Sequence, residues 1–213
     1  WCNVVPRSMG PDGRGLYTLL DTLILVESHK RGLRLKSPKF PYATLDAMSK
    51  TELAELDYEG ALVLDAIPGI YEHVYSFDFK TLYPSIILSS NIGFDTANDE
   101  GKIVNPSGAR YDKFPDSVLS TVLQYLLTKR KEYKDKKLQL IADNLKDTPE
   151  YEAAEADEVI VKELANSLYG ILGAKWGRYY ESKKLVESVT LMGQYLITSL
   201  QTFFESKGFK VIL

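Results

Sequence analysis

Apolar residues recur at helical spacing in four separate stretches of the chain. Side chains three and four positions apart lie on one face of a helix, so each stretch predicts an amphipathic helix with one buried face. Asp116 or Ser117 is a suitable N-cap for the second helix, and Gly208 is a suitable C′ residue for the fourth. The predicted helices cover residues 16–30, 117–145, 151–169 and 183–207.

The rest of the pattern predicts β segments and loops around these helices. The second and third helices are separated only by the polar sequence KDTPEY, so they should form an antiparallel hairpin. A further short helix is expected beyond Pro84. Residues 58–72 predict a β segment turning at Pro68-Gly69, residues 73–79 and 209–213 predict strands, and residues 1–15 and 91–116 predict loops.

Composition limits the classes of function without choosing one. With 213 residues and 45% apolar content, the chain can build one large domain or two small ones. A net charge of −3 excludes a broadly basic nucleic-acid binder, so any such site must be local. The single cysteine, Cys2, excludes an internal disulfide framework and suits a reducing, intracellular compartment. Because the chain begins at Trp1 and ends in an apolar run, we interpret it as an internal piece of a longer protein.

Asp78 lies in the apolar run SFDFKTLYPSII, residues 76–87. An ionised carboxylate in apolar surroundings is costly unless it is paired or binds a metal. Asp78 is therefore either a solvated residue at a strand end or a functional group. Carboxylate oxygens are the ligands that Mg²⁺ prefers, so a metal is the functional alternative.

The third predicted helix carries Lys162, Asn166 and Tyr169 at spacings that place them on one face, beside Gly170. This face offers a cation, an amide and an aromatic ring next to a position where a ligand or backbone can approach closely. The alternative is a solvated lysine followed by an ordinary helix end.

The sequence KRKEYKDKK, residues 129–137, has six positive and two negative side chains. Arg130 and Lys134 are four residues apart on one helix face, a spacing that suits phosphate oxygens. The alternative is an exposed helix whose acidic residues pair with their neighbours. A hairpin would bring Arg130, Lys134 and Lys162 toward one surface, which predicts a polyphosphate site without a P-loop sequence.

Together these segments resemble family B DNA polymerases. DFKTLYPSII (78–87) resembles their first palm motif, D-x-x-S-L-Y-P-S, and KELANSLYG (162–170) resembles their fingers motif, K-x-x-x-N-S-x-Y-G. YEGALV (58–63) is similar to their Y-x-G-G/A segment, and LLTKRKEYK (126–134) to their first fingers helix. The matches occur in the order of the family and cover residues 16–213.

The resemblance implies an α+β fold, in which a palm of antiparallel sheet and packed helices carries an antiparallel two-helix fingers insertion. Residues 1–15 would be a loop from a preceding region, residues 16–112 the first part of the palm, residues 113–173 the fingers and residues 174–213 the continuing palm. The implied activity is template-directed DNA synthesis, by nucleotidyl transfer from a dNTP to a primer 3′-OH with two Mg²⁺ ions. DNA primer-template and dNTP would be the partners, with no membrane.

The resemblance also implies roles for individual residues around the triphosphate. Asp78 would ligate both Mg²⁺ ions and the carbonyl of Phe79 one of them, while backbone N–H groups near Thr81 and Leu82 would hold the β- and γ-phosphates. The fingers residues Arg130, Lys134, Lys162 and Asn166 would bind the triphosphate, and Lys162 would also act in catalysis.

A second group would contact the sugar and the DNA. Tyr83 would lie under the deoxyribose and leave no room for a 2′-OH, and Pro84 is expected to hold Tyr83 extended. Tyr169 and Gly170 would face the nascent base pair, and Tyr58 and Gly60 the template strand.

One expected motif is missing from the sequence. The second metal motif of the family, Y-G-D-T-D-S, does not occur, and we expect it just beyond residues 209–213. The isolated chain is therefore expected to be inactive. Two alternatives stay open: a non-catalytic nucleic-acid-binding homologue, and one half of a split polymerase that needs a partner chain.

Overall fold

The computed structural model describes residues 15–35, 58, 60–174, 179 and 183–212. Predictions for residues 1–14, for residues 36–57 and 59 of the first palm region, and for residues 175–178, 180–182 and 213 lie outside these ranges. The elements are α1 (Gly15–Lys30), α4 (Leu82–Ser89), β1 (Ile103–Val104), β2 (Arg110–Tyr111), α5 (Val118–Ala142), α6 (Pro149–Gly173) and α7 (Lys183–Ser206). The four long helices agree with the predicted ones to within a few residues.

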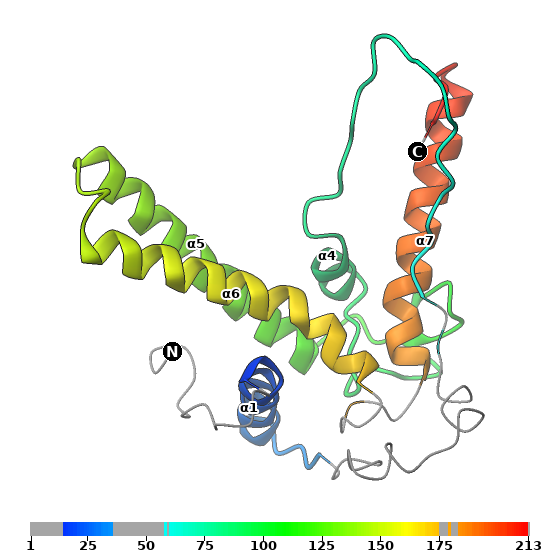
Figure 1. The fold of residues 1–213 in the computed structure, drawn as a ribbon. Coiled ribbons are helices and arrows are strands. Elements are labelled where there is room, and N and C mark those ends of the chain that lie inside the picture. Colours follow the sequence, from blue (N-terminus) through cyan, green and yellow to red (C-terminus); the bar gives the residue numbers. More distant parts are fainter. Residues whose placement is uncertain (1–14, 36–57, 59, 175–178, 180–182, 213) are drawn as a thin grey trace, which may run out of the picture.

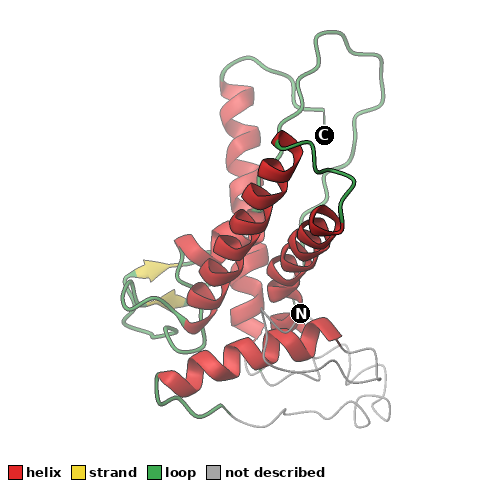
Figure 2. Ribbon diagram, turned by 90° about the vertical axis from the view of Figure 1, so that its left-hand side faces the viewer, coloured by secondary structure: helices red, strands yellow, loops and turns green. Residues whose placement is uncertain are grey.

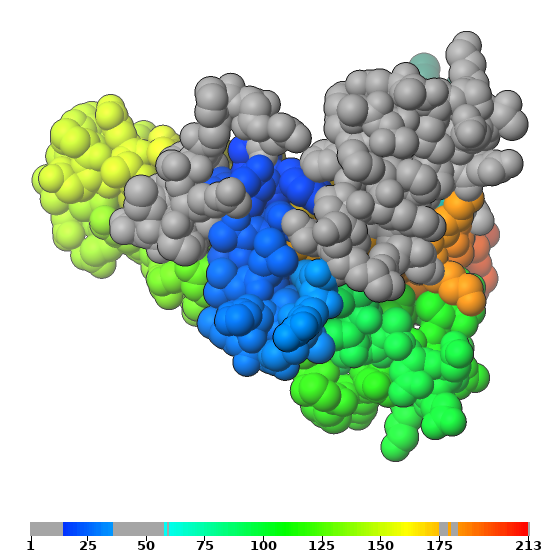
Figure 3. Space-filling model, turned by 90° about the horizontal axis from the view of Figure 1, so that it is seen from below, coloured from blue at the N-terminus to red at the C-terminus, as the bar shows by residue number. Residues whose placement is uncertain are grey.

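Helices α5 and α6 form the predicted antiparallel hairpin, which projects away from α7 (Figure 1). Helix α4 lies between the hairpin and α7 and packs against all three of those helices. Helix α1 packs across the base of the hairpin, and Figure 3 shows it along the face seen from below. One core joins the elements, with fully buried side chains that include Leu20, Ile24, Leu119, Leu123, Leu164 and Leu168.

The helix ends follow from their capping residues. Ser117 precedes α5, and its hydroxyl accepts a hydrogen bond from the backbone N–H of Ser120, as the sequence predicted. Thr148 caps α6 in the same way, with Pro149 at the first helical position. Gly208 follows α7 with a φ of +84°, the left-handed conformation that ends many helices.

The prediction for the helix near Pro84 is corrected by the structure. Helix α4 begins at Leu82, before the proline, because a proline in the first helical turn has no hydrogen bond to lose. Tyr83 is therefore helical, and the extended conformation expected for a residue before proline is wrong. The backbone turns sharply into this helix at Thr81, the N-cap residue, whose φ of +54° is in the left-handed region.

The strand predictions are also wrong in the described part of the chain. Residues 60–80 and 209–212 contain no strand, and β1 and β2 form a two-stranded antiparallel sheet within the predicted 91–116 loop. Figure 2 shows this sheet as a small feature beside the helices. A strand requires a hydrogen-bonded neighbour, and one such bond is formed here, from Ile67 N to Ile212 O at 3.1 Å.

The 91–116 segment is tied firmly to α7 despite its loop composition. Tyr111 is 1% exposed, and its hydroxyl donates a hydrogen bond of 2.7 Å to Ser188 Oγ. Asn105 Nδ2 donates to the backbone carbonyl of Ser188 at 3.0 Å. Buried polar groups of this kind are stable only when they are paired, so these contacts fix the segment in place.

None of the helices in the described part of the chain combines the length and the apolar character that a membrane span requires.

Candidate nucleotide and nucleic-acid site

Three tyrosines from distant parts of the chain meet between α4, α6 and the segment before residue 61. The ring centroids of Tyr83 and Tyr169 are 4.5 Å apart, and the rings are tilted by 50°. The Tyr169 hydroxyl donates a long hydrogen bond of 3.4 Å to the Tyr58 hydroxyl. Aromatic rings at this separation and tilt attract one another beyond simple burial. The structure thus brings together three residues that the sequence had singled out separately.

Two glycines make room for this tyrosine cluster, Tyr58, Tyr83 and Tyr169. A Cβ atom at Gly193 of α7 would lie 3.3 Å from Tyr83 Cε1. A Cβ atom at Gly173, the last residue of α6, would lie 2.6 Å from the Tyr58 hydroxyl oxygen. Either substitution would therefore displace a ring of the cluster.

Burial also changes the acid–base chemistry of the tyrosine cluster. The pKa of Tyr169 is raised far above its ordinary value, first by burial and then by the neighbouring Tyr58 hydroxyl. Burial likewise raises the pKa of Tyr83, with a smaller effect from Tyr58. Both hydroxyl groups are neutral at any ordinary pH, so they can donate hydrogen bonds and repel no phosphate.

The predicted template segment is held by α7. Gln194 Nε2 donates a hydrogen bond of 2.8 Å to the carbonyl oxygen of Gly60, and Gly60 itself is exposed. This contact places Gly60 next to the helix that also carries Gly193. Spacing along the chain gave no signal for Gln194 or Gly193, because their role depends on how α7 packs against the rest of the fold.

Asp78 is exposed at the edge of a large hollow. The hollow, of about 1040 Å³, is lined by residues from the segment 64–79, the second half of α7 and residues 209–212; Figure 1 shows the segment before α4 following α7 and then arching away from it. Phe77 stacks on Phe204 within it, with ring centroids 5.1 Å apart. Asp78 is therefore a solvated carboxylate beside an apolar wall, although the apolar run around it forms no strand.

Residues next to Asp78 lead directly into α4. Phe79 and Leu82 line the same hollow as Asp78. The Thr81 hydroxyl donates to the carbonyl of Lys80 at 2.7 Å, and the Thr81 carbonyl accepts from Ser85 N at 2.9 Å. The first N–H groups of a helix have no partner within the helix, so those of α4 are available to a ligand beside Asp78.

The cations of the hairpin face an acidic residue that the sequence reasoning missed. Glu158 of α6 is 4.0 Å from Arg130 Nε and 2.6 Å from Lys137 Nζ. These ion pairs join α5 to α6. Lys129, by contrast, pairs with Glu132 on its own helix at 2.6 Å, as expected for an ordinary solvated face. The charged run therefore pairs with acidic residues both on its own helix and on α6.

The predicted row on α6 is present and open to solvent. Lys162, Asn166 and Gly170 are exposed, whereas Tyr169 is half-buried against Tyr83. Glu158 lies one turn before Lys162 in the same row. Among the described residues, no hydrogen bond or ion pair connects Asp78 with this row or with the cations of α5, so the candidate residues form two separate groups.

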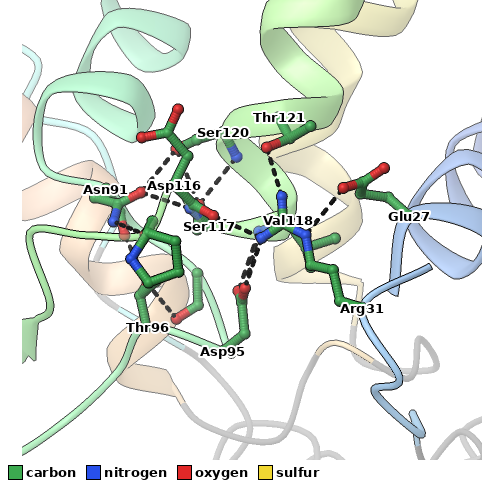
Figure 4. Close-up of polar contacts among 12 residues, drawn as sticks. Glu27, Arg31, Asn91, Asp95, Thr96, Asp116, Ser117, Val118, Ser120 and Thr121 are labelled. Carbon is green, nitrogen blue, oxygen red and sulfur yellow. Dashed lines mark hydrogen bonds and ion pairs between the residues drawn. The ribbon is translucent and has the colours of Figure 1, made fainter. Parts of the chain in front are cut away.

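A polar network at the base of the hairpin fixes where α5 begins (Figure 4). Arg31, just after α1, donates to the carbonyl of Asp116 and to the Thr121 hydroxyl, each at 2.6 Å. Asp95 accepts from Val118 N at 3.0 Å and is 3.4 Å from Arg31 Nη1. Burial raises the pKa of Asp95, against the opposing effects of the Val118 N–H and of Arg31.

The second half of this network is buried under the first turn of α5. Asn91 Oδ1 accepts from Ser117 N at 2.7 Å, and Asn91 Nδ2 donates to the carbonyls of Asp112 and Pro115. The Ser117 hydroxyl, 0% exposed, donates to the carbonyl of Ile92 at 3.0 Å. Neither Asn91 nor Arg31 stands out in the sequence, because each acts on a segment far along the chain.

Comparison with known proteins gives the family. Residues 18–212 match DNA polymerase family B. A DNA polymerase of Archaeoglobus fulgidus is 32% identical over 202 residues, which cover 94% of this chain and 23% of that protein. DNA polymerase 1 of Pyrococcus abyssi is 34% identical over 159 residues, covering 73% of this chain and 20% of that protein.

The fold agrees with the same family. The structure of the family B DNA polymerase from the hyperthermophilic archaeon Pyrobaculum calidifontis matches 92% of this chain and 25% of that one, with a TM-score of 0.64 and 24% identity. This likeness confirms the α+β fold class expected from the motifs. The chain spans between 20% and 25% of the length of these relatives. The match over residues 18–212 nevertheless covers most of the chain, which belongs to DNA polymerase family B.

Proposed function

We propose that this chain forms part of the nucleotide site of a DNA-directed DNA polymerase, which joins a dNTP to a primer 3′-OH opposite a DNA template. The observation that carries the proposal is the meeting of Tyr58, Tyr83 and Tyr169, one from each of three motifs. Residues 16–112 and 174–213 would belong to the palm and residues 113–173 to the fingers. The projection of the α5–α6 hairpin from the remaining helices supports this division.

In this proposal the hairpin holds the triphosphate. Arg130, Lys134 and Lys162 supply positive charge, and Asn166 supplies an amide beside Lys162. Pre-positioned cations stabilise the charge that develops on the leaving pyrophosphate, and Lys162 would act in this step. The exposure of Lys134, Lys162 and Asn166 supports the proposal, because a soluble triphosphate must reach them.

Tyr83 would select the sugar. Its ring packs against Tyr169, and a Cβ atom at Gly193 would lie 3.3 Å from it, so close packing supports a fixed surface under the deoxyribose. A ring that cannot move away leaves no room for a 2′-OH. Tyr169 and Gly170 would then face the nascent base pair.

Tyr58 and Gly60 would contact the template strand. The hydrogen bond between Gln194 and Gly60 supports this proposal, because it holds the exposed Gly60 backbone in one place.

Asp78 and the carbonyl of Phe79 would be ligands of two Mg²⁺ ions. Their oxygen atoms suit this metal, which commonly binds one or two carboxylates together with substrate phosphates. Asp78 is exposed, which supports its access to such an ion. When bound, the ions would neutralise phosphate charge and activate the attacking hydroxyl. Thr81 and Leu82 would contribute backbone N–H groups to the phosphates beside Asp78.

Primer extension by the polymerase that contains this chain tests the proposal. Asp78→Asn should abolish dNTP incorporation while primer-template binding, measured by fluorescence anisotropy, is retained. Asp99→Asn makes the same change of charge at another exposed position and should retain incorporation. DNA binding by the wild type without any incorporation would favour a non-catalytic homologue instead. Incorporation by Asp78→Asn at the normal rate would disprove the metal assignment.

A further inference from the structure

Glu158 lies among three cationic side chains where α5 and α6 meet. Its closest contact is to Lys137 Nζ at 2.6 Å, and only 14% of its side chain is exposed. The hydrogen bond from Lys137, followed by the charges of Lys137, Arg130 and Lys134, holds the pKa of Glu158 below its ordinary value. Glu158 is therefore ionised at neutral pH, and its oxygen atoms occupy a position among cations that a phosphate oxygen would also favour.

Helical spacing places this carboxylate within the candidate triphosphate clamp. On each arm of the hairpin, residues three or four positions apart form a row along one face. The rows are Arg130, Lys134 and Lys137 on α5, and Glu158, Lys162 and Asn166 on α6. The ion pairs of Glu158 with Arg130 and Lys137 show that the α5 row faces the Glu158 end of the α6 row. A negative charge thus lies one helical turn from Lys162.

We infer that Glu158 competes with the nucleotide triphosphate for the cations of the hairpin and so weakens nucleotide binding. The inference rests on the proposed function, since it requires the triphosphate to bind along these two rows. Two effects act in the same direction: Glu158 partly neutralises Arg130 and Lys134, and its own charge repels the phosphates. In the absence of nucleotide, the same carboxylate relieves the repulsion between the three cations of α5.

The chain provides a matched control in Glu163, which is also on α6 and is exposed. Five residues correspond to about 500° around a helix, so Glu163 faces about 140° away from the Glu158 row. Glu163→Gln and Glu158→Gln remove the same charge from the same helix. They differ in whether that charge faces the cations of α5.

The test is calorimetric titration of the 213-residue chain with inorganic tripolyphosphate at about 0.05 M salt. Glu158→Gln should bind about five-fold more tightly than the wild type, the size expected for one unit charge about 4 Å away in a water-like dielectric. Glu163→Gln should match the wild type. The difference should shrink near 0.5 M salt, where exposed charges are screened. Equal binding by Glu158→Gln and the wild type, or equal tightening by both variants, would overturn the inference.

A measurement on the wild type covers the case in which Glu158→Gln does not fold. The side-chain carboxyl pKa of Glu158, followed by carbon NMR, should rise toward its ordinary value when tripolyphosphate is saturating. An unchanged pKa would show that the ligand does not displace the ion pairs, and the inference would be wrong.

Steady-state kinetics separate this inference from the proposed function. In the polymerase that contains this chain, Glu158→Gln should lower the KM for dNTP by about the same five-fold as the binding change. Normal incorporation with an unchanged KM would reject the role of Glu158 alone. A wild-type protein that incorporates no nucleotide would reject the proposed function, while the tripolyphosphate titration would still test Glu158.

Discussion

Arg31→Ala should destabilise the base of the α5–α6 hairpin more than any exposed charge change. The guanidinium donates to the Asp116 carbonyl and to the Thr121 hydroxyl at 2.6 Å each, and it pairs with Asp95 and Glu27. A hydrogen bond to a charged group contributes about 1.5–3 kcal/mol, and the variant loses the bonds to Asp116 and Thr121 together with the longer bond to Asp95 at 3.4 Å and the bond to Glu27. Because 25% of the side chain is exposed, water can replace part of this loss. We expect the free energy of unfolding to fall by about 2–4 kcal/mol.

The remaining carboxylate adds to this cost. Asp95 is half-buried, and burial already raises its pKa while Arg31 opposes that rise. Without the guanidinium, Asp95 keeps the N–H of Val118 and loses its positive partner. A charge left partly buried without its counter-ion is costly, so the pKa of Asp95 should rise further in the variant.

Urea unfolding of the chain, followed by circular dichroism, measures the effect. Lys30→Ala is the matched control, because Lys30 pairs with the same Glu27 at 3.5 Å from a side chain that is 67% exposed. Exposed pairs of this kind contribute at most about 1 kcal/mol. If Arg31→Ala costs no more than Lys30→Ala, the network does not hold the hairpin. Hydrogen exchange at the first turn of α5 should accelerate in Arg31→Ala and not in the control.

Three further predictions concern other parts of the molecule. Gly193→Ala should displace the Tyr83 ring and change the ratio of rNTP to dNTP incorporation in primer extension. If Tyr83→Ala changes this ratio and Gly193→Ala does not, Gly193 does not position the Tyr83 ring. The lowered pKa of Glu158 means that its ionised form favours the folded state, so its contribution to stability should be lost as pH falls below the ordinary value of 4.5. In urea unfolding across this range, Glu158→Gln should show a weaker loss of stability than the wild type, and parallel curves would contradict the assignment. Tyr111→Phe should cost about 1 kcal/mol, because it removes the buried hydrogen bond to Ser188 Oγ while that oxygen keeps its contact with Ser107 Oγ; an unchanged unfolding midpoint would show that the Tyr111 bond does not stabilise the fold.

Helices could be predicted from this sequence because their information is local. Apolar spacing marks the buried face of α5, α6 and α7, and capping residues such as Ser117 and Gly208 mark their ends. The strand expected at residues 73–79 fails for the opposite reason. Its apolar and aromatic residues favour a strand, yet a strand forms only beside a partner, and Val74, Tyr75 and Phe77 are exposed here.

The candidate site was predictable only to the extent that its residues lie in recognisable motifs. Tyr58, Tyr83 and Tyr169 could be singled out, but their mutual contact depends on how α4 and α6 pack. Gly193 carries no motif at all, and its importance is evident only from the Cβ atom that it lacks. Glu158 resembles many exposed acids in the sequence, and it is distinguished by the register of α5 against α6.

Helix α6 connects the two parts of the candidate site mechanically. Lys162 and Tyr169 are seven residues apart on one continuous helix, which separates them by about 10 Å along its axis. Lys162 and Tyr169 therefore cannot move independently while α6 stays straight. Arg31 fixes the hairpin at the start of α5, and Glu158 joins the two helices further along. A tilt of the hairpin about its base would consequently move the candidate phosphate contact at Lys162 and the candidate base-pair contact at Tyr169 together, so a nucleotide that engages one of them positions the other.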